Sequence, residues 1–144
     1  MQPVKINDKL FVMGQPSLAD FDVLAGQGIA TIINDRPDGE DAAQPGTAAE
    51  QSAALAAGLA YAHVPVTLGS ISMDDVRAFQ DVLSKSEGPV LAHCKSGVRA
   101  LSLHVIGEVL DGRLRHDDVR DFGAVHGFDL SGAEAWLKAN RNGS

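Results

Sequence analysis

The chain has 144 residues, 44% hydrophobic and 22% charged, a balance typical of one soluble globular domain over residues 1–144. Its formal net charge of −7 at pH 7 excludes nucleic acid and anionic membranes as expected partners, because the field of the whole protein repels polyanions. A single cysteine excludes an internal disulfide, and without a signal peptide or a membrane-spanning apolar segment it predicts a reducing, cytoplasmic location.

The predicted elements alternate between short strands and helices. Apolar and β-branched runs predict strands at 10–13, 30–33, 60–64 and 90–94, the first of them at an edge of the sheet. Helices are expected after capping boxes at Ser17–Asp20, Thr47–Glu50, Ser72–Asp75 and Ser131–Glu134, and also near 98–110 and 117–124. This alternation predicts an α/β fold in which a mainly parallel central sheet of four to five strands is flanked by helices.

In a fold of this class the functional site lies beyond the carboxyl ends of the parallel strands. Three predicted loops follow strands at that edge, at 34–46, 65–72 and 93–99. We therefore expect these three loops to converge on one site.

The third loop holds Cys94 between a buried strand and the start of a helix. Oriented backbone N–H groups and a helix N-terminus stabilise a thiolate and bind anions. The predicted substrate-binding residues of the loop are Lys95, Ser96, Gly97 and Val98. Arg99 adds forked donors that match two oxygens of an oxyanion. This pattern favours Cys94 as a nucleophile over an inert buried cysteine, with Arg99 as the second catalytic residue.

Two further residues have both a functional and a structural interpretation. Arg36 follows a strand directly, so it either reaches the substrate or forms an ion pair with Glu40 or Asp41. His93 precedes Cys94 in a strand, where adjacent side chains point to opposite faces, so it is expected to support the loop from the far side. His63 is expected to be a core or rim residue.

Four segments of the chain together resemble one bacterial family. They are Gly14-Gln15-Pro16-Ser17, Ile33-Asn34-Asp35-Arg36-Pro37-Asp38-Gly39-Glu40, Val64-Pro65-Val66 and His93-Cys94-Lys95-Ser96-Gly97-Val98-Arg99. The chain resembles the phosphatase-like domain of beta-lactamase hydrolase-like proteins, the DUF442 family. The resemblance implies a tyrosine or dual-specificity phosphatase-like fold. It also implies persulfide dioxygenases or sulfide:quinone oxidoreductases as partners, because members occur beside them.

The chain departs from phosphatases of this type at three places. Their loop has five residues between cysteine and arginine, whereas four stand between Cys94 and Arg99, the number found in rhodaneses. Thr67 stands where these phosphatases place a general-acid Asp, and Ala100 where they place Ser or Thr. Losing a positioned acid costs about 10²–10⁴-fold in the expulsion of an alkoxide, but sulfur transfer needs no such acid.

These departures favour a rhodanese-type sulfurtransferase, which moves sulfane sulfur from thiosulfate or a glutathione persulfide through a Cys94 persulfide to a thiol acceptor. The alternative is a phosphatase-like hydrolase with a Cys94 phosphocysteine intermediate, whose acid would be Asp35, Asp74 or Asp75. A second alternative is a non-catalytic anion-binding or partner-docking module. No cofactor is expected, and the spacing of the five histidines predicts no metal site.

Overall fold

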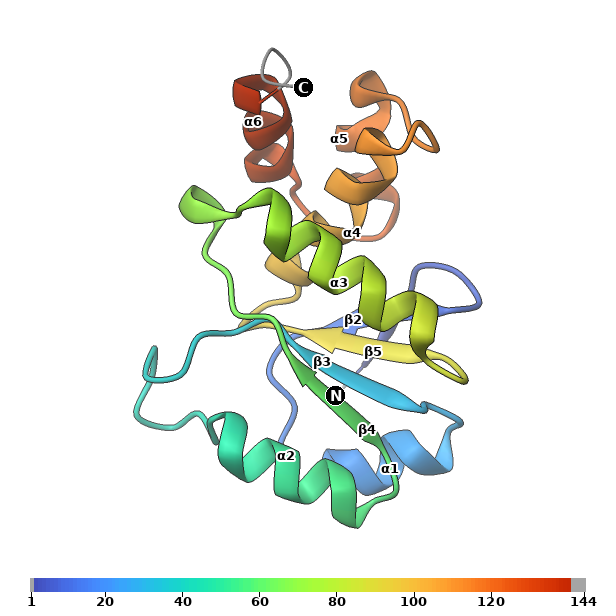
Figure 1. Ribbon diagram of the computed structural model, residues 1–144, viewed down its shortest axis with the longest axis vertical. Helices are drawn as coiled ribbons and strands as arrows, with labels where there is room; N and C mark the ends of the chain where they lie inside the picture. Colours follow the sequence, from blue (N-terminus) through green and yellow to red (C-terminus); the bar gives the residue numbers. More distant parts are fainter. Residues whose placement is uncertain (1, 141–144) are drawn as a thin grey trace.

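The fold is built on a five-stranded sheet, seen in a computed structural model that describes residues 2–140. Its strand order is β1-β2-β5-β3-β4, and the strands are β1 (Val4–Lys5), β2 (Leu10–Met13), β3 (Thr31–Asn34), β4 (Ala60–His63) and β5 (Val90–His93). β2, β5, β3 and β4 run parallel to their neighbours, and β1 pairs antiparallel with β2 (Figure 1). The predicted α/β class and mainly parallel sheet are confirmed.

The edge of the sheet differs from the prediction. β1 pairs Val4 with Val12 and Lys5 with Phe11, so β2 is an interior strand and its expected edge position is wrong. The sequence does not predict β1, because two residues are too few to show the alternation that marks a strand. β2 therefore lies directly beside β5, the strand that leads to Cys94.

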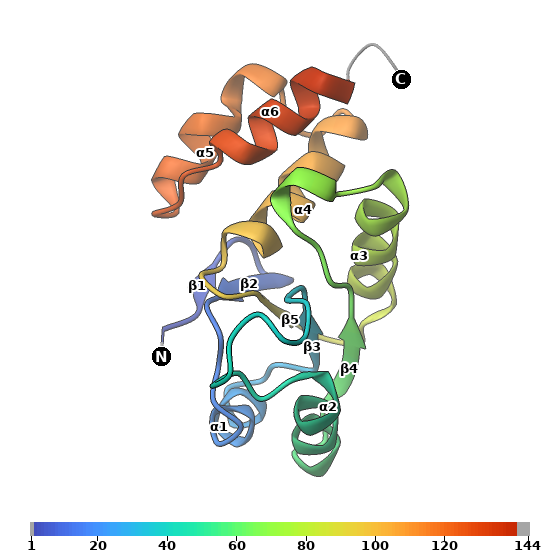
Figure 2. The ribbon, with the colours of Figure 1, turned by 90° about the vertical axis from the view of Figure 1, so that its left-hand side faces the viewer.

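Helices cover both faces of the sheet. α1 (Asp20–Gly26) and α2 (Thr47–Ala56) lie on one face, and α3 (Met73–Lys85) and α4 (Val98–Leu110) on the other (Figure 2). α5 (Val119–Val125) and α6 (Ser131–Asn140) pack on the outer side of α4 (Figure 2). Two short 3-10 turns contact them: Leu68–Ser70 contacts α6, and His116–Asp118 contacts α5. Each face of the sheet buries its own apolar cluster. None of the helices within residues 2–140 is long and apolar enough to cross a membrane.

The helix starts confirm one of the predicted capping boxes. The Ser72 hydroxyl accepts from the Asp75 N–H at 3.0 Å, and the Asp75 carboxylate accepts from the Ser72 N–H at 2.9 Å. The box predicted at Thr47 is wrong, because Glu50 is buried and bonds to other elements instead. Half of the box predicted at Ser17 is present, because the Asp20 carboxylate accepts from the Ser17 N–H at 2.8 Å, although the helix begins only at Asp20. The box predicted at Ser131 is not formed, since α6 begins at Ser131 itself.

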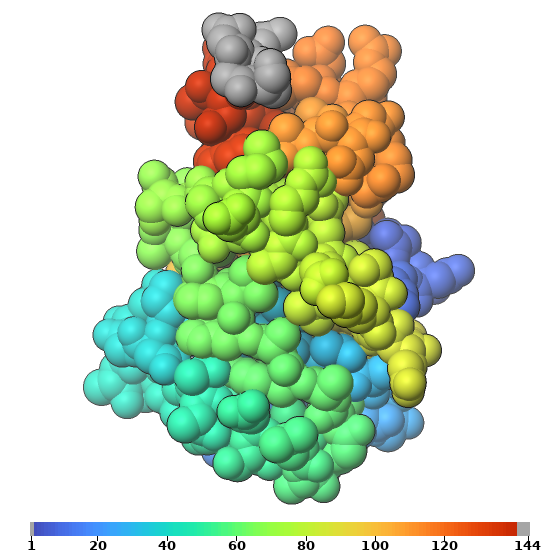
Figure 3. Space-filling model, viewed as in Figure 1, coloured from blue at the N-terminus to red at the C-terminus, as the bar shows by residue number. Residues whose placement is uncertain are grey.

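The carboxyl ends of the four parallel strands lie at one edge of the sheet, and the loops that follow them gather there (Figure 1). In the space-filling view the cyan loop after β3 borders the green segment after β4 (Figure 3). The ring of His63 bonds to the carbonyl of Arg36 at 2.9 Å and ties the two together. The predicted convergence of three loops is therefore present.

Candidate active site

Cys94 lies at the end of β5, with its side chain fully buried in a loop that leads into α4. The Gly97 N–H donates to the Cys94 Sγ at 3.0 Å. The N–H groups of Lys95, Ser96, Val98 and Arg99 have no acceptor among residues 2–140. Uncommitted donors at the start of a 13-residue helix are a ready site for an anion. The loop therefore presents donors around the thiol, as its sequence predicts.

Close packing holds the shape of this loop. Gly97 has a φ of +97°, a conformation that favours glycine, and a Cβ there would come within 2.9 Å of the Phe128 ring. On the other side the Gln15 N–H donates to the carbonyl of Lys95 at 3.2 Å, and a Cβ on Gly14 would meet that same oxygen at 2.9 Å. The segment after β2 and the turn before α6 thus both support the loop, and the sequence gives no sign of the contact with Phe128.

The guanidinium of Arg99 is held so that part of its donor set stays unused. Nη1 donates to Glu40 at 2.7 Å and to the carbonyl of Val66 at 2.9 Å, and Nη2 donates to Glu40 at 2.9 Å. A guanidinium has five N–H donors in a fixed plane, so the Nε–H and one Nη2–H have no oxygen acceptor in residues 2–140. These two are parallel and form the fork that binds two oxygens of an oxyanion. The pKa of Arg99 is raised by its hydrogen bond to Glu40 and further by the charge of Cys94 and a hydrogen bond to it.

Glu40 connects Arg99 to Arg36. One of its carboxylate oxygens also accepts from the Arg36 Nε at 3.0 Å, so one carboxylate lies between two guanidinium groups. Hydrogen bonds first from Arg99 and then from Arg36 lower the pKa of Glu40 to about 2, so it is ionised at neutral pH. Of the two interpretations of Arg36, the structure shows the ion pair with Glu40. The side chain is buried, and its other acceptor is Gln15 at 3.0 Å.

A second buried pair supports the loop from the opposite face of the sheet. The His93 Nε2 lies 2.7 Å from a carboxylate oxygen of Glu50, and both side chains are almost completely buried. The other oxygen of Glu50 accepts from Gln15 Nε2 at 2.8 Å. A continuous set of hydrogen bonds therefore runs through Arg99, Glu40, Arg36, Gln15, Glu50 and His93, and we call it the Arg99–His93 network. Sequence reasoning places His93 correctly but misses Gln15 and Glu50.

Asp35 is a buried carboxyl that receives no hydrogen bond from the residues that the structure describes, so its ionised form is disfavoured. It follows β3 directly, its side chain is fully buried, and neither carboxylate oxygen has a hydrogen-bond partner in the described part of the chain. Burial, and then the negative charge of Cys94, raise the pKa of Asp35 well above its usual value, although Arg99 opposes the shift. Asp35 is therefore a protonated acid over a range in which most carboxyls are ionised.

The segment after β4 holds no acid in the position that the phosphatase pattern requires. Thr67 is exposed and its hydroxyl bonds to Ser70. Asp74 and Asp75 lie in the first turn of α3, and the carboxylate of Asp75 is engaged in the capping box. Ala100 is buried within α4. Of the three acids considered from the sequence, Asp35 is the one that is buried, and its carboxyl has no hydrogen-bond partner among the residues described.

The remaining predicted residues lie at the rim. Lys95 and Ser96 are exposed on the loop, where Lys95 can attract anions without contacting the thiol. Val98 opens α4 and contributes its backbone N–H. His63, on β4, binds the loop after β3 through the carbonyl of Arg36, which agrees with the structural role expected for it.

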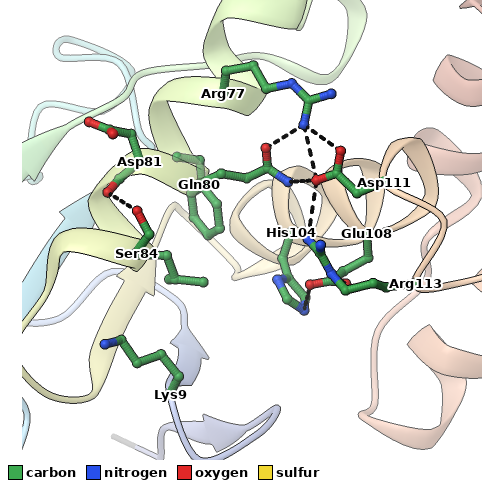
Figure 4. Close-up of a pocket in the computed structure, with 11 residues that line it drawn as sticks. Lys9, Arg77, Gln80, Asp81, Ser84, His104, Glu108, Asp111 and Arg113 are labelled. Carbon is green, nitrogen blue, oxygen red and sulfur yellow. Dashed lines mark hydrogen bonds and ion pairs between the residues drawn. The ribbon is translucent and has the colours of Figure 1, made fainter.

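A pocket of about 540 Å³ lies between α3 and α4, away from Cys94 (Figure 4). Its polar groups bind one another: Arg77 donates to both carboxylate oxygens of Asp111 at 2.9 and 3.1 Å, and Gln80 donates to Asp111 at 2.8 Å. Glu108 accepts from Arg113 in the same way. None of the 11 lining residues belongs to the Cys94 loop, so we call it the α3–α4 pocket and treat it apart from the site.

A parallel sheet whose carboxyl edge holds a cysteine loop, a following arginine and a helix N-terminus defines a phosphatase-like domain. The chain belongs to the family of phosphatase-like domains of beta-lactamase hydrolase-like proteins, whose model matches residues 4–111. This confirms the resemblance drawn from the four motifs. The match includes the whole Arg99–His93 network and ends before α5 and α6, which contribute Phe128 to the loop's surroundings.

Curated relatives and solved structures agree with this assignment. Over 138 residues the chain is 53% identical to the beta-lactamase hydrolase-like protein of Agrobacterium fabrum and 51% identical to that of Xylella fastidiosa. These matches cover 96% of this chain but 32% of each relative, so the chain spans about a third of their length.

Among solved structures, a candidate phosphatase from Neisseria meningitidis superposes with a TM-score of 0.84 at 31% identity, over 94% of this chain and 96% of that one. A candidate phosphatase of the DUF442 family from Shewanella putrefaciens has a TM-score of 0.76 at 22% identity, over 97% and 91% of the two chains, and supports the fold alone. The comparisons thus favour the phosphatase-like alternative over the sulfurtransferase that the sequence ranks first.

Proposed function

We propose that the protein is a cysteine-dependent, phosphatase-like hydrolase of phosphate monoesters. The observation that carries this proposal is the set of unused donors around Cys94: the loop N–H groups and the free fork of Arg99. Together they match the three non-bridging oxygens of a phosphoryl group. The family and the Neisseria structure, which are described as phosphatase-like and as a candidate phosphatase, support the same chemistry.

In this mechanism the Cys94 thiolate attacks phosphorus and forms an S–P bond, while the bond from phosphorus to the ester oxygen breaks. That oxygen leaves with the bonding electron pair and takes up a proton. Water then attacks the phosphocysteine, releasing inorganic phosphate and restoring the thiolate. The loop N–H groups and Arg99 stabilise the charge on the transferring group in both steps.

The segment after β4 narrows the substrate class. Thr67 stands where an acid would protonate the leaving oxygen, so the leaving group must depart with little help. Phenoxides leave more easily than alkoxides without a proton. We therefore expect aryl phosphates to be hydrolysed and alkyl phosphates to be slower by about the 10²–10⁴-fold that general acid catalysis supplies.

Sulfur transfer is the second candidate, and the same observation favours it. A site without a leaving-group acid, built on a four-residue loop, suits attack of the Cys94 thiolate on a sulfane sulfur, from which sulfite or a thiolate leaves without a proton. The persulfide would then pass to an acceptor thiol. Thiosulfate or glutathione persulfide would be the donor, and a persulfide dioxygenase or sulfide:quinone oxidoreductase a partner.

One experiment separates the two. The protein, Cys94→Ser and Ala100→Ser are each incubated with an aryl phosphate, and phosphate release is measured; separate samples receive thiosulfate, and their intact mass is recorded. Phosphate release that Cys94→Ser abolishes and Ala100→Ser retains or increases supports the hydrolase. A Cys94-dependent gain of one sulfur atom, removed by cyanide, without phosphate release would replace it by the sulfurtransferase. If the protein neither releases phosphate nor gains sulfur, the non-catalytic anion-binding module is the interpretation that remains.

A further inference from the structure

Asp35 and Cys94 directly follow two neighbouring strands, β3 and β5. β3 and β5 run parallel with Asn34 opposite His93, and the Asp35 N–H donates to the carbonyl of His93 at 2.7 Å. The paired residues of the two strands end with Asn34 and His93, so Asp35 is the next residue after β3 and Cys94 is the next residue after β5. Both strands end at the same level of the sheet, at the mouth of the site.

The two side chains also point to the same face of the sheet. His93 bonds to Glu50 of α2, and Asn34 bonds to Tyr61, whose hydroxyl bonds to Thr47 of α2. Adjacent residues in extended chain point to opposite faces, so Asp35 and Cys94 are directed toward α3 and α4. The carboxyl and the thiol are thus neighbours in one buried compartment.

The charges that face Asp35 are few. Cys94 faces it from the end of β5, Arg99 from the first turn of α4, and Asp75 from the first turn of α3. Arg99 is engaged mainly by Glu40, and the carboxylate oxygens of Asp35 have no hydrogen-bond donor within residues 2–140. Two negative charges in such surroundings repel strongly, because burial removes the screening by water.

We infer that Asp35 and Cys94 share a single negative charge between the loss of the first proton and the loss of the second, so that in this range Asp35 holds the proton when Cys94 is the thiolate nucleophile. The exchange is Cys94–SH plus Asp35–COO⁻ to Cys94–S⁻ plus Asp35–COOH, which moves one proton and changes no net charge. Asp35 is accordingly a positioning residue that acts through the nucleophile. The inference holds for phosphoryl and for sulfur transfer alike, because both begin from the thiolate.

The test is the pH dependence of Cys94 alkylation by iodoacetamide, followed by intact mass. Coupled sites lose their protons in two steps, and we expect the rate for the unchanged protein to rise in two steps more than about one pH unit apart. Asp35→Asn keeps the size of the side chain but cannot ionise, so its rate should rise in one step. Asp75→Asn, the matched control, should retain two steps. Identical profiles for the protein and Asp35→Asn would overturn the inference.

A measurement on the unchanged chain guards against misfolding of the variant. Infrared difference spectra across the pH range follow the C=O band of the buried carboxylic acid, before and after alkylation. Once Cys94 is alkylated it carries no charge, so the band should be lost at a lower pH than in the unmodified protein. Titration at the same pH in both forms would contradict a shared charge. Neither readout requires turnover, so failure of the proposed hydrolase activity would not affect the result.

Discussion

The α3–α4 pocket and the Cys94 site differ in how far their polar groups are satisfied. The pocket has a volume of about 540 Å³, yet its arginines and carboxylates are paired with one another (Figure 4). The thiol of Cys94 is buried, yet its site leaves backbone N–H groups, the free fork of Arg99 and the Asp35 carboxyl without hydrogen-bond partners among the residues described. Buried polar groups normally have hydrogen-bond partners in a folded protein, so a cluster of buried groups without partners indicates where a ligand binds.

The two regions also differ in how their charges are fixed. Ion pairs of the pocket lie near the surface, where such pairs contribute about 0–1 kcal/mol. The Arg99–His93 network lies largely beneath it, and each of its members is bound by the next. Substitutions in the two regions should therefore separate by size of effect and by what they affect.

The largest effect is expected for Arg99→Lys. Lysine keeps the positive charge but loses the planar fork, and both the Glu40 pair and the free donors to the substrate depend on that fork. We expect kcat/KM for an aryl phosphate to fall about 10²–10³-fold, the usual cost of losing one transition-state donor. Arg77→Lys in the pocket is the control and should leave kcat/KM unchanged. A smaller loss for Arg99→Lys than for Arg77→Lys would reverse the comparison.

Glu50→Gln should come next, with its main effect on stability. An amide in place of the carboxylate can accept from His93 or from Gln15 but not from both, and its NH₂ group then faces another donor. The free energy of unfolding, measured by urea denaturation, is expected to fall by about 1–3 kcal/mol, the cost of a buried unsatisfied group. An unchanged urea midpoint would show that the network can rearrange.

Asp35→Asn should make stability less dependent on pH. The folded protein holds the Asp35 proton more tightly than the unfolded chain, so the stability from this group is fully present below the ordinary value of 3.8 and is lost as pH rises through the raised pKa. Asparagine does not titrate. The variant should therefore be more stable than the unchanged protein near neutral pH and lose this advantage at acidic pH. Urea midpoints of both proteins at the two pH values measure the difference. Parallel pH dependence of the two proteins would count against a protonated Asp35.

The smallest effect is expected for Asp111→Asn in the pocket. The substitution weakens the bonds from Arg77 and Arg113, both at partly exposed positions. Stability should fall by less than about 1 kcal/mol, and phosphate release should not change. A loss of activity with this variant would mean that the pocket communicates with Cys94, and the division drawn between the two regions would fail.

Local sequence signals were sufficient to predict much of this. The strand before Cys94, the glycine turn and the helix that starts after it are adjacent in the chain, so their composition and spacing predict their geometry. The convergence of the loops follows from the rule that parallel sheets place sites at the carboxyl ends of their strands. The direction of His93, toward the face of the sheet that α2 covers, follows from the alternation of side chains along β5.

What the sequence could not predict depends on contacts between distant segments. Glu50 has the spacing of a capping residue for α2, but tertiary packing brings it to His93, 43 positions along the chain. Gln15 and Phe128 reach the loop in the same way, from the segment after β2 and from the turn before α6. Asp35 stands in a polar, turn-rich segment, so its complete burial depends on how α3 and α4 close over the strand ends.

The Arg99–His93 network has a consequence for how this site can vary. Arginines and glutamates alternate along it with Gln15 between them, so replacing one member leaves its neighbour with an unmatched charge. Single-position mutational scans should therefore score nearly every member as intolerant, whatever its distance from Cys94. The site is expected to diverge by concerted pairs of substitutions, with strong epistasis between positions that never contact the substrate.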